Sequence, residues 1–240
     1  MGQYYYAAII RRKKYDEKKE KWLIDRAKKL GEPASYIDKL ELYHPFDYDN
    51  NLLKLMEHSY WGNKYAMTVE SQLIRKKGRW EPPNFAVIGD YAKVDHYYPT
   101  DKDGDSNVEV IEHQVSDVKE CPEFKQFEDV IRIRQSAFSD QFRMRKAYSI
   151  LNPDKTYYAL NWTKKEYVQM NGCPIYDDEW PVRIDPLFIL CSVGNGRGGG
   201  DYRGDNLKLA GAWAFDQIEV CEDKPKGDEW TEIKPMFRMD

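Results

Sequence analysis

The sequence predicts an α+β fold, with a mixed or antiparallel sheet flanked by helices. Short aromatic and β-branched runs, such as residues 3–10 and 85–88, are typical of strands. Residues 16–30 instead place apolar side chains at helical spacing. Hydrophobic residues make up 41% and aromatic residues 14% of the 240 residues, which is enough apolar material for a substantial core.

The predicted first strand, residues 3–10, leads into an amphipathic helix that begins near Asp16. We expect Gly31 and Pro33 to end this helix. Its many charged residues would then form the solvated face. A short helix followed by a loop fits residues 33–50. The apolar stripe of the amphipathic helix has spacings of three, four and seven residues and consists of Tyr15, Trp22, Leu23, Ala27 and Leu30.

The remainder of the N-terminal half alternates between helical and extended patterns. Residues 52–58 fit a short strand or a helical turn, and residues 61–63 predict a tight turn. We expect a helix over residues 65–76 and a buried strand over residues 85–88. Residues 95–107 are polar and rich in turn formers, which predicts an exposed loop.

The C-terminal half also combines helical and extended sequence patterns. Residues 123–151 carry two adjacent apolar stripes, which favour a largely buried helix, and an alternating pattern at residues 131–134 leaves a strand there as the alternative. We expect a strand over residues 156–161 and a short helix over residues 185–193 with a proline in its first turn. Residues 213–220 are the predicted closing strand.

The two ends of the chain resemble each other at a constant offset. The matched residues are Tyr5, Tyr6, Ala7, Lys13 and Tyr15 at the first end and Tyr157, Tyr158, Ala159, Lys165 and Tyr167 at the second. One compact domain, residues 1–240, could therefore hold two pseudo-repeated β–helix–β halves, residues 1–115 and 152–240, joined by a helical segment at 116–151. The halves would share one core and one sheet. A Tyr- and Lys-rich composition produces such matches by accident as well, so both interpretations stay open.

The charge balance and the cysteine pattern narrow the function classes. Thirty-seven Lys and Arg residues face 41 Asp and Glu residues, a net charge of −4, which makes general nucleic-acid binding unlikely. The first residues form no signal peptide, and no apolar run is long enough to span a membrane. Four scattered cysteines without a C-x-x-C pair indicate reduced thiols. We expect a protein of the bacterial host cytoplasm.

The best candidate site is the loop at residues 194–205, which contains six glycines. Glycine lets backbone N–H groups approach a ligand closely, and the two arginines could grip a phosphate or a carboxylate. The loop matches neither a Walker A nor a Rossmann pattern. The alternative is a structural loop whose arginines and aspartates pair with one another. The predicted binding residues are Asn195, Arg197, Asp201, Tyr202, Arg203 and Asp205.

A second candidate group is Glu57, His58, Trp61 and Asn63, which could contact a ligand or partner opposite that loop. A structural role for the lone His58 is the competing interpretation. No catalytic residue, metal ligand or cofactor is predicted, because the histidines are isolated. Ser192 also lacks a nucleophile elbow around it.

Several motifs resemble an uncharacterised family of phage and prophage proteins. These are MGQYY at residues 1–5, LMEHSY-x-GN at 55–63, GRW at 78–80, V-x-GDYA at 87–92, TKKEY at 163–167 and GNGRGGGDYRG at 194–204. The resemblance implies a phage context, and it carries over no catalytic residue.

Together these observations predict a phage-encoded, non-enzymatic binding protein that inhibits or redirects a host system, plausibly as an anti-CRISPR-like inhibitor of antiviral defence. Its expected partner is a host bacterial protein, with a nucleotide or other anionic small molecule as a further ligand. The alternative function is a nucleotide- or phosphate-sequestering protein, or a phosphate-handling enzyme, that uses the glycine- and arginine-rich loop. A structural phage component is a third hypothesis.

Overall fold

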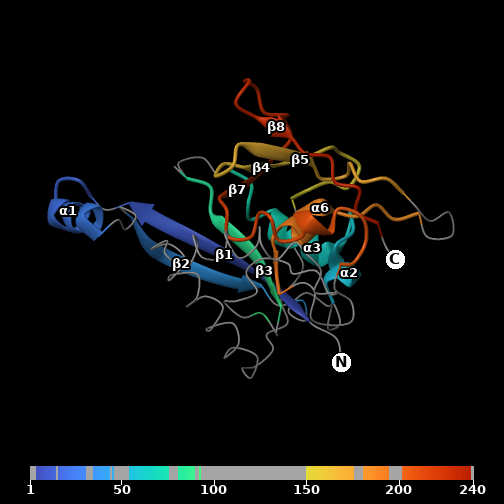
Figure 1. The fold of residues 1–240 in the computed structure, drawn as a ribbon, viewed down its shortest axis with the longest axis horizontal. Coiled ribbons are helices and arrows are strands. Elements are labelled where there is room, and N and C mark those ends of the chain that lie inside the picture. The colour runs from blue at the N-terminus through green and yellow to red at the C-terminus, as the bar shows by residue number, and fades with distance from the viewer. Residues whose placement is uncertain are drawn as a thin grey trace.

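A computed structural model shows an α+β fold built on two mixed four-stranded sheets (Figure 1). It describes residues 4–14, 16–30, 35–43, 45, 54–75, 81–89, 92, 150–175, 181–194 and 202–238. In these ranges the strands are β1 (Tyr5–Lys14), β2 (Ser35–Tyr43), β3 (Asn84–Gly89), β4 (Tyr158–Asn161), β5 (Glu166–Gln169), β6 (Ser192–Val193), β7 (Ile218–Cys221) and β8 (Thr231–Glu232). The helices there are α1 (Lys21–Leu30), α2 (Leu55–His58), α3 (Lys64–Glu70), α6 (Pro186–Leu190) and the 3-10 helix η4 (Leu207–Leu209).

The first sheet has the strand order β2-β1-β3-β6, with β1 antiparallel to both of its neighbours and β6 parallel to β3. Every residue from Tyr5 to Ile10 of β1 is buried. Tyr5, Ala7 and Ile9 face the main core, whereas Ala8 and Ile10 join a smaller cluster on the opposite face. Both faces of this part of the sheet are therefore covered, which explains its continuous apolar run.

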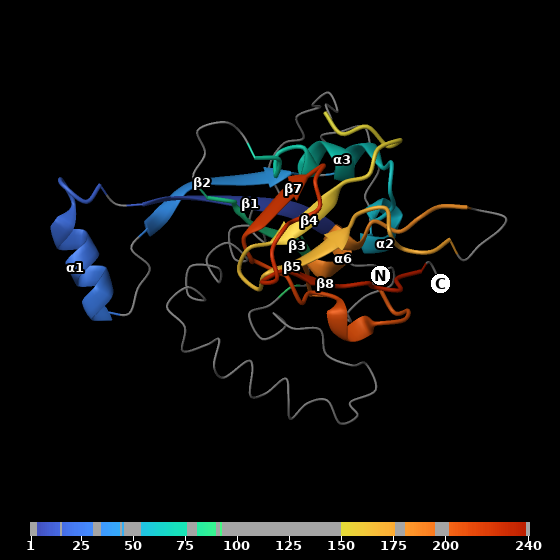
Figure 2. The same cartoon turned by 90° about the horizontal axis from the view of Figure 1, so that it is seen from above.

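The second sheet has the order β7-β4-β5-β8, and it lies over the first sheet when seen from above (Figure 2). Both sheets contribute to one main core, which contains Ala7 and Val87 from the first and Ala159 and Val220 from the second. The start of β3 also joins the start of β7 through hydrogen bonds, such as that from Phe85 N to Asp216 O (3.0 Å). The two halves of the chain are thus packed as one body.

The two sheets have a common local topology. Each sheet has a central strand with an antiparallel neighbour on either side. In the first sheet β1 lies between β2 and β3, and in the second β4 lies between β5 and β7. The matched tyrosines stand at the starts of the two central strands. The halves form separate sheets rather than the single shared sheet expected above. The pseudo-repeat itself stays a prediction.

Several predicted boundaries were wrong in the N-terminal third. The first strand continues to Lys14, and residues 16–20 form turns before α1 begins at Lys21. Residues 35–43, expected as a helix and a loop, form strand β2. Pairing with β1 along the whole strand decides this segment, because cross-strand hydrogen bonds outweigh its weak local preference.

Elsewhere the short elements agree well with expectation. β3, the turn at Gly62 and the short helix α6 occupy the predicted places, and α6 is capped by Asp185 with Pro186 in its first turn. The predicted helix over residues 65–76 ends early, at Glu70. The expected closing strand starts only at Ile218, after a series of turns.

Some expectations fall on residues outside the described ranges. These are the loop at 95–107 and nearly all of the helical segment at 116–151. Among the described residues, no helix is both long and apolar enough to cross a membrane. Cys173, Cys191 and Cys221 are free thiols, as expected for these three positions.

The hydroxyl group of Tyr65 ties helix α3 to the end of the β1–β2 ladder. Tyr65 Oη accepts a hydrogen bond from Ala7 N (2.9 Å) and donates one to Tyr43 O (2.8 Å). Ala7 and Tyr43 are opposite each other in the register, so the hydroxyl lies between two backbone groups that face one another. All three residues are buried.

We predict that Tyr65→Phe destabilises the fold by about 1–3 kcal/mol, because it leaves a buried N–H and a buried carbonyl without this partner. Chemical denaturation with urea measures the loss. Tyr158→Phe is the matched control, since the Tyr158 hydroxyl makes no hydrogen bond among the described residues, and it should change stability by less than about 0.5 kcal/mol. Equal effects of the two substitutions would contradict the bridging role.

Candidate functional site

The described end of the glycine-rich loop is anchored to the C-terminal segment. Tyr202 is buried against Phe237, with ring centroids 4.8 Å apart, and its hydroxyl donates to Asp205 O (2.5 Å). Asn206 Oδ1 accepts from Met236 N (2.7 Å), and Asp205 Oδ2 lies 3.8 Å from Arg238 Nε. Tyr202 is therefore an internal anchor rather than a surface contact.

The other predicted residues of this loop divide into two groups. Arg203 is exposed and makes no ion pair among the described residues, so its guanidinium group faces solvent. Asn195, Arg197 and Asp201 lie outside the described residues. Local packing explains the glycine at position 204, because the Cβ atom of any other residue there would come 2.8 Å from the Tyr202 hydroxyl. Ligand binding by the loop stays a prediction.

The residues of the second candidate group mainly hold local structure. Glu57 accepts from Lys54 N (2.8 Å) at the start of α2, and Asn63 caps α3 by accepting from Ala66 N (3.0 Å). Trp61 Nε1 donates to Pro153 O (2.8 Å). Tyr60 pairs with Ile184 in an isolated bridge. Among the described residues this group contacts residues 153–157 and 183–188.

His58 is enclosed between aromatic rings. Its side chain is fully buried, at 5.4 Å from the Tyr65 ring and 5.1 Å from the Phe188 ring, both in edge arrangements. Neither ring nitrogen makes a hydrogen bond among the described residues. Burial lowers the His58 pKa to about 3, so the imidazole is neutral at physiological pH. In this conformation His58 cannot reach a partner at the surface.

A pair of buried carboxyl groups, Glu70 and Asp185, lies in the same region of the core, and sequence reasoning missed it. Burial raises the pKa of Glu70 well above its usual value, and the negative charge of Asp185 adds to this effect. Burial also raises the pKa of Asp185 to about 6. Two buried carboxylates repel each other and lack the solvation that would stabilise their charge, so Glu70 stays protonated beside Asp185 at neutral pH.

This pair has a structural task. Asp185 Oδ1 accepts from Leu187 N (3.1 Å) and so caps helix α6, whose five residues are all buried. Glu70 is the last residue of helix α3, so the two carboxyl groups interact between the end of one helix and the start of another. Both carboxyl groups are fully buried, and therefore neither is open to a substrate from solvent.

The TKKEY motif also has a structural explanation. Lys164 Nζ donates to Ala212 O and lies 3.6 Å from Asp216 Oδ2, which also accepts from Asn161 Nδ2 (2.7 Å). Trp213 Nε1 donates to Glu166 Oε2 (2.6 Å). These contacts fix the turn between β4 and β5 against the turns that precede β7.

An aromatic surface patch beside this turn is internally satisfied. Lys165 Nζ lies 4.4 Å from the ring centroid of Trp162 and 5.1 Å from that of Trp230. Trp162 Nε1 donates to Glu219 Oε2 (2.8 Å), and Glu219 lies 3.9 Å from Arg75 Nε. The polar groups of this patch are occupied by one another, so it offers little to a ligand.

A projecting arm is formed, within residues 11–39, by the outer end of β1, helix α1 and the outer part of strand β2. Residues Tyr5–Ile10 of β1 pair with β3 on one side, whereas Arg11–Lys14 pair with β2 alone. The outer half is therefore a two-stranded ribbon. Four strand residues span about 13 Å, and Figures 1 and 2 both show α1 beyond the ribbon, away from both sheets.

Sequence reasoning treated the charges of this arm as the solvated face of a packed helix. The structure corrects this interpretation, because α1 has no sheet beneath it and Trp22, assigned to the inward stripe, is 62% exposed. A signal was present in the sequence. Residues 11–30 contain ten Lys and Arg against four Asp and Glu, although the whole chain has a net charge of −4.

We predict that Glu70→Gln changes how stability depends on pH. The folded-state pKa values of Glu70 and Asp185 lie above their unfolded values of 4.5 and 3.8, so their contribution is complete below about pH 4 and is lost as pH rises through about 6 and beyond. An amide at position 70 removes one ionisable group. The variant should gain on the order of 1–3 kcal/mol over the wild type between pH 5 and pH 8.

Urea denaturation at several pH values measures this difference. The opposite loss from His58, whose stability contribution falls as pH drops below 6.5, is common to both proteins and cancels. Asp228→Asn, at an exposed position, is the control and should leave the curve parallel to that of the wild type. If the free energy of unfolding of Glu70→Gln followed the same pH dependence as that of the wild type, the proposed interaction of the two carboxyl groups would be disproved.

The comparisons with known proteins add no family to this picture. No family model, no curated protein and no solved structure matches this chain. The resemblance to phage and prophage proteins therefore stays a prediction.

Proposed function

We propose that this chain is a non-enzymatic binding protein that engages a host macromolecule through the projecting arm. One observation carries the proposal: helix α1 holds cations and an indole ring in solvent, beyond the ribbon. Trp22 is 62% exposed, and Lys21, Arg26, Lys28 and Lys29 make no ion pair among the described residues. An exposed aromatic group among cations is costly to solubility and typical of contact surfaces.

The placement of the reactive side chains supports binding rather than catalysis. His58, Glu70, Asp185, Cys173 and Cys191, whose pKa values are strongly displaced, are all buried in the core. A catalytic group must reach a substrate. Among the described residues, no cluster of His, Cys, Asp and Glu could hold a metal ion.

The phage motifs of the sequence give this binding protein a biological setting. A phage protein that acts by binding would inhibit or redirect a host system, and antiviral defence is the proposed target. The body supports such a role as a scaffold, because β1 is covered on one face by the main core and on the other by a smaller cluster that includes Phe215. A rigid base reduces the conformational entropy that the arm loses when its tip binds a partner.

We expect affinity purification from bacterial lysate to enrich one host component with the wild type and to lose it with a triple variant, Trp22→Ala, Arg26→Ala and Lys29→Ala. All three side chains are exposed, so the variant should fold, and circular dichroism checks this. Quantitative mass spectrometry and nucleic-acid staining of the eluate measure the enrichment.

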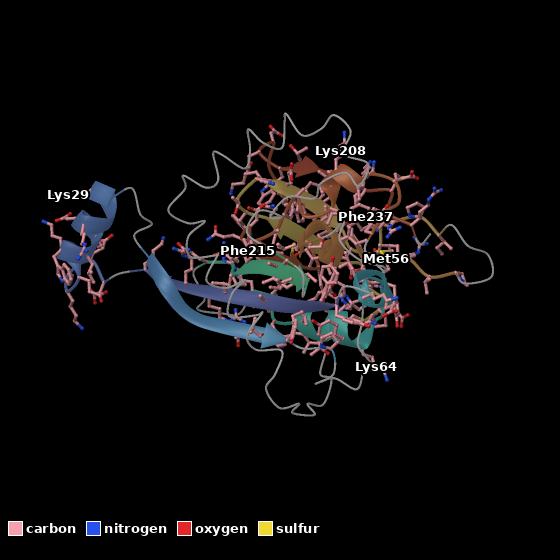
Figure 3. The ribbon with its side chains drawn as sticks, turned by 60° about the horizontal axis from the view of Figure 1, so that its bottom comes forward. Lys29, Met56, Lys64, Lys208, Phe215 and Phe237 are labelled. Atoms are coloured by element: carbon pink, nitrogen blue, oxygen red, sulfur yellow. The ribbon has the colours of Figure 1, made fainter. Side chains whose placement is uncertain are left out.

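The matched control is Lys64→Ala with Lys226→Ala, two exposed lysines of the body that make no ion pair among the described residues. Figure 3 labels Lys64 on the body and Lys29 on the isolated helix. The control should retain the host component in full. Equal recovery with the arm variant and the wild type would exclude the arm as the binding surface.

A further inference from the structure

Charge is segregated in this molecule between the arm and the body. Residues 11–30 carry ten cationic and four acidic residues, whereas the other 220 residues carry 27 cationic and 37 acidic residues. The net charge of −4 is thus the sum of a strongly basic tip and a strongly acidic body. A polyanion would be repelled by the body and attracted only to the arm.

The acidic residues of the arm are partly used by its own backbone. Asp16 Oδ1 accepts from Lys18 N (2.9 Å) and Lys19 N (3.2 Å), and Glu20 Oε2 accepts from Asp16 N (2.6 Å). These bonds form the turn that leads into α1. The carboxylates therefore build the tip, while Lys18 and Lys19 make no ion pair among the described residues.

Two cations of the ribbon, in contrast, form ion pairs. Arg11 Nε lies 2.5 Å from Glu41 Oε2, and Lys14 Nζ lies 2.6 Å from Glu81 Oε1. Cations at both ends of the ribbon are thus neutralised, whereas Lys21, Arg26, Lys28 and Lys29 of α1 make no ion pair among the described residues. Figure 3 shows Lys29 among the side chains that surround α1 on the far side of the ribbon from the body.

Trp22 lies where the apolar and charged faces of α1 meet, next to Leu23 on one side and to a charged side that also contains the exposed Asp25 on the other. Residues 22, 26 and 29 are spaced i, i+4 and i+7, so Trp22, Arg26 and Lys29 form one stripe along the helix. All three are exposed, whereas Leu23 and Ile24 are half-buried. An indole ring flanked by two cations can stack on a planar base while the cations contact the neighbouring phosphates.

This arrangement decides among the polyanions that a basic arm could bind. A helix that lies on an anionic membrane offers it a continuous apolar face, whereas Trp22 lies at the border between the apolar and charged faces and its apolar neighbours Leu23 and Ile24 are already half-buried. An acidic protein surface offers carboxylates but few planar faces for the indole. The base faces of a duplex are stacked inside it, whereas those of a single strand are accessible.

We infer that the stripe Trp22, Arg26 and Lys29 of α1 binds single-stranded nucleic acid, by stacking of the indole on a base and by phosphate contacts of the two cations. This inference rests on the proposed function, in which the arm is the binding surface, and it names the class of partner. It replaces the expectation from the overall net charge, which averages over the two oppositely charged parts.

The test is fluorescence anisotropy of the full chain with a labelled single-stranded DNA of about 15 nucleotides. Trp22→Ala should weaken binding by roughly 5- to 100-fold, and Trp22→Phe should restore part of the loss. Arg26→Ala with Lys29→Ala should reduce the slope of log K against log salt by roughly 1.4, because two phosphate contacts are removed. The Trp22 variants should leave that slope unchanged.

The controls separate the competing partners. Lys64→Ala with Lys226→Ala should bind like the wild type. Equal or tighter binding to the matching duplex, binding only to phosphatidylglycerol vesicles, or equal competition by polyglutamate would each overturn the inference. If the affinity purification recovered a host protein only with an intact arm, and no oligonucleotide bound, the nucleic-acid inference would be overturned and the proposed function would stand. If the arm variants behaved like the wild type in the affinity purification and in the anisotropy assay, the proposed function and the nucleic-acid inference would both be overturned.

Discussion

The rest of the structure depends on how strand β1 is held. Its inner residues, Tyr5–Ile10, are buried on both faces and bonded on both edges, by β2 and by β3. Four cationic residues follow immediately, and charges cannot enter such a core without partners. Pairing with β3 ends at Ile10, and Arg11, the first cation, pairs with Glu41 and donates to Gln72 O (3.4 Å) at the edge of the body. One continuous strand thus forms the centre of the first sheet and also the base of the arm.

The second half of the chain is secured by groups that the first half supplies. The hydroxyl of Tyr65 lies between backbone groups of β1 and β2, and the ring of Phe188 packs against Tyr65, Phe85 and His58. The interacting carboxyl groups of Glu70 and Asp185 are buried between the end of α3 and the start of α6. These buried polar contacts fix orientation as well as stability, because only one arrangement satisfies them.

The division between scaffold and arm also explains the motif residues. Much of LMEHSY-x-GN caps helices or fills the core, and TKKEY fixes a hairpin turn against the residues before β7. Such roles follow from folding alone. Helix α1 has a different character, because its exposed indole and its cations, which make no ion pair among the described residues, contribute little to folding and are positioned for contact with another molecule.

The sequence by itself determined the local elements whose signals are short-range. The buried run at the start of β1, strand β3, the turn at Gly62 and the Asp185-Pro186 start of α6 each follow from side-chain pattern or backbone geometry. Part of the candidate site was also visible in the sequence, since an exposed Arg203 agrees with the predicted surface loop.

Only the tertiary structure decided which faces are covered. Residues 35–43 form a strand because β1 lies beside them, and Trp22 is exposed because no sheet lies under α1. His58 and Glu70 acquire displaced pKa values because distant segments enclose them. The physical reason is common to all four cases: burial and pairing are properties of neighbours in space, and a local pattern shows only which side chains could accept them.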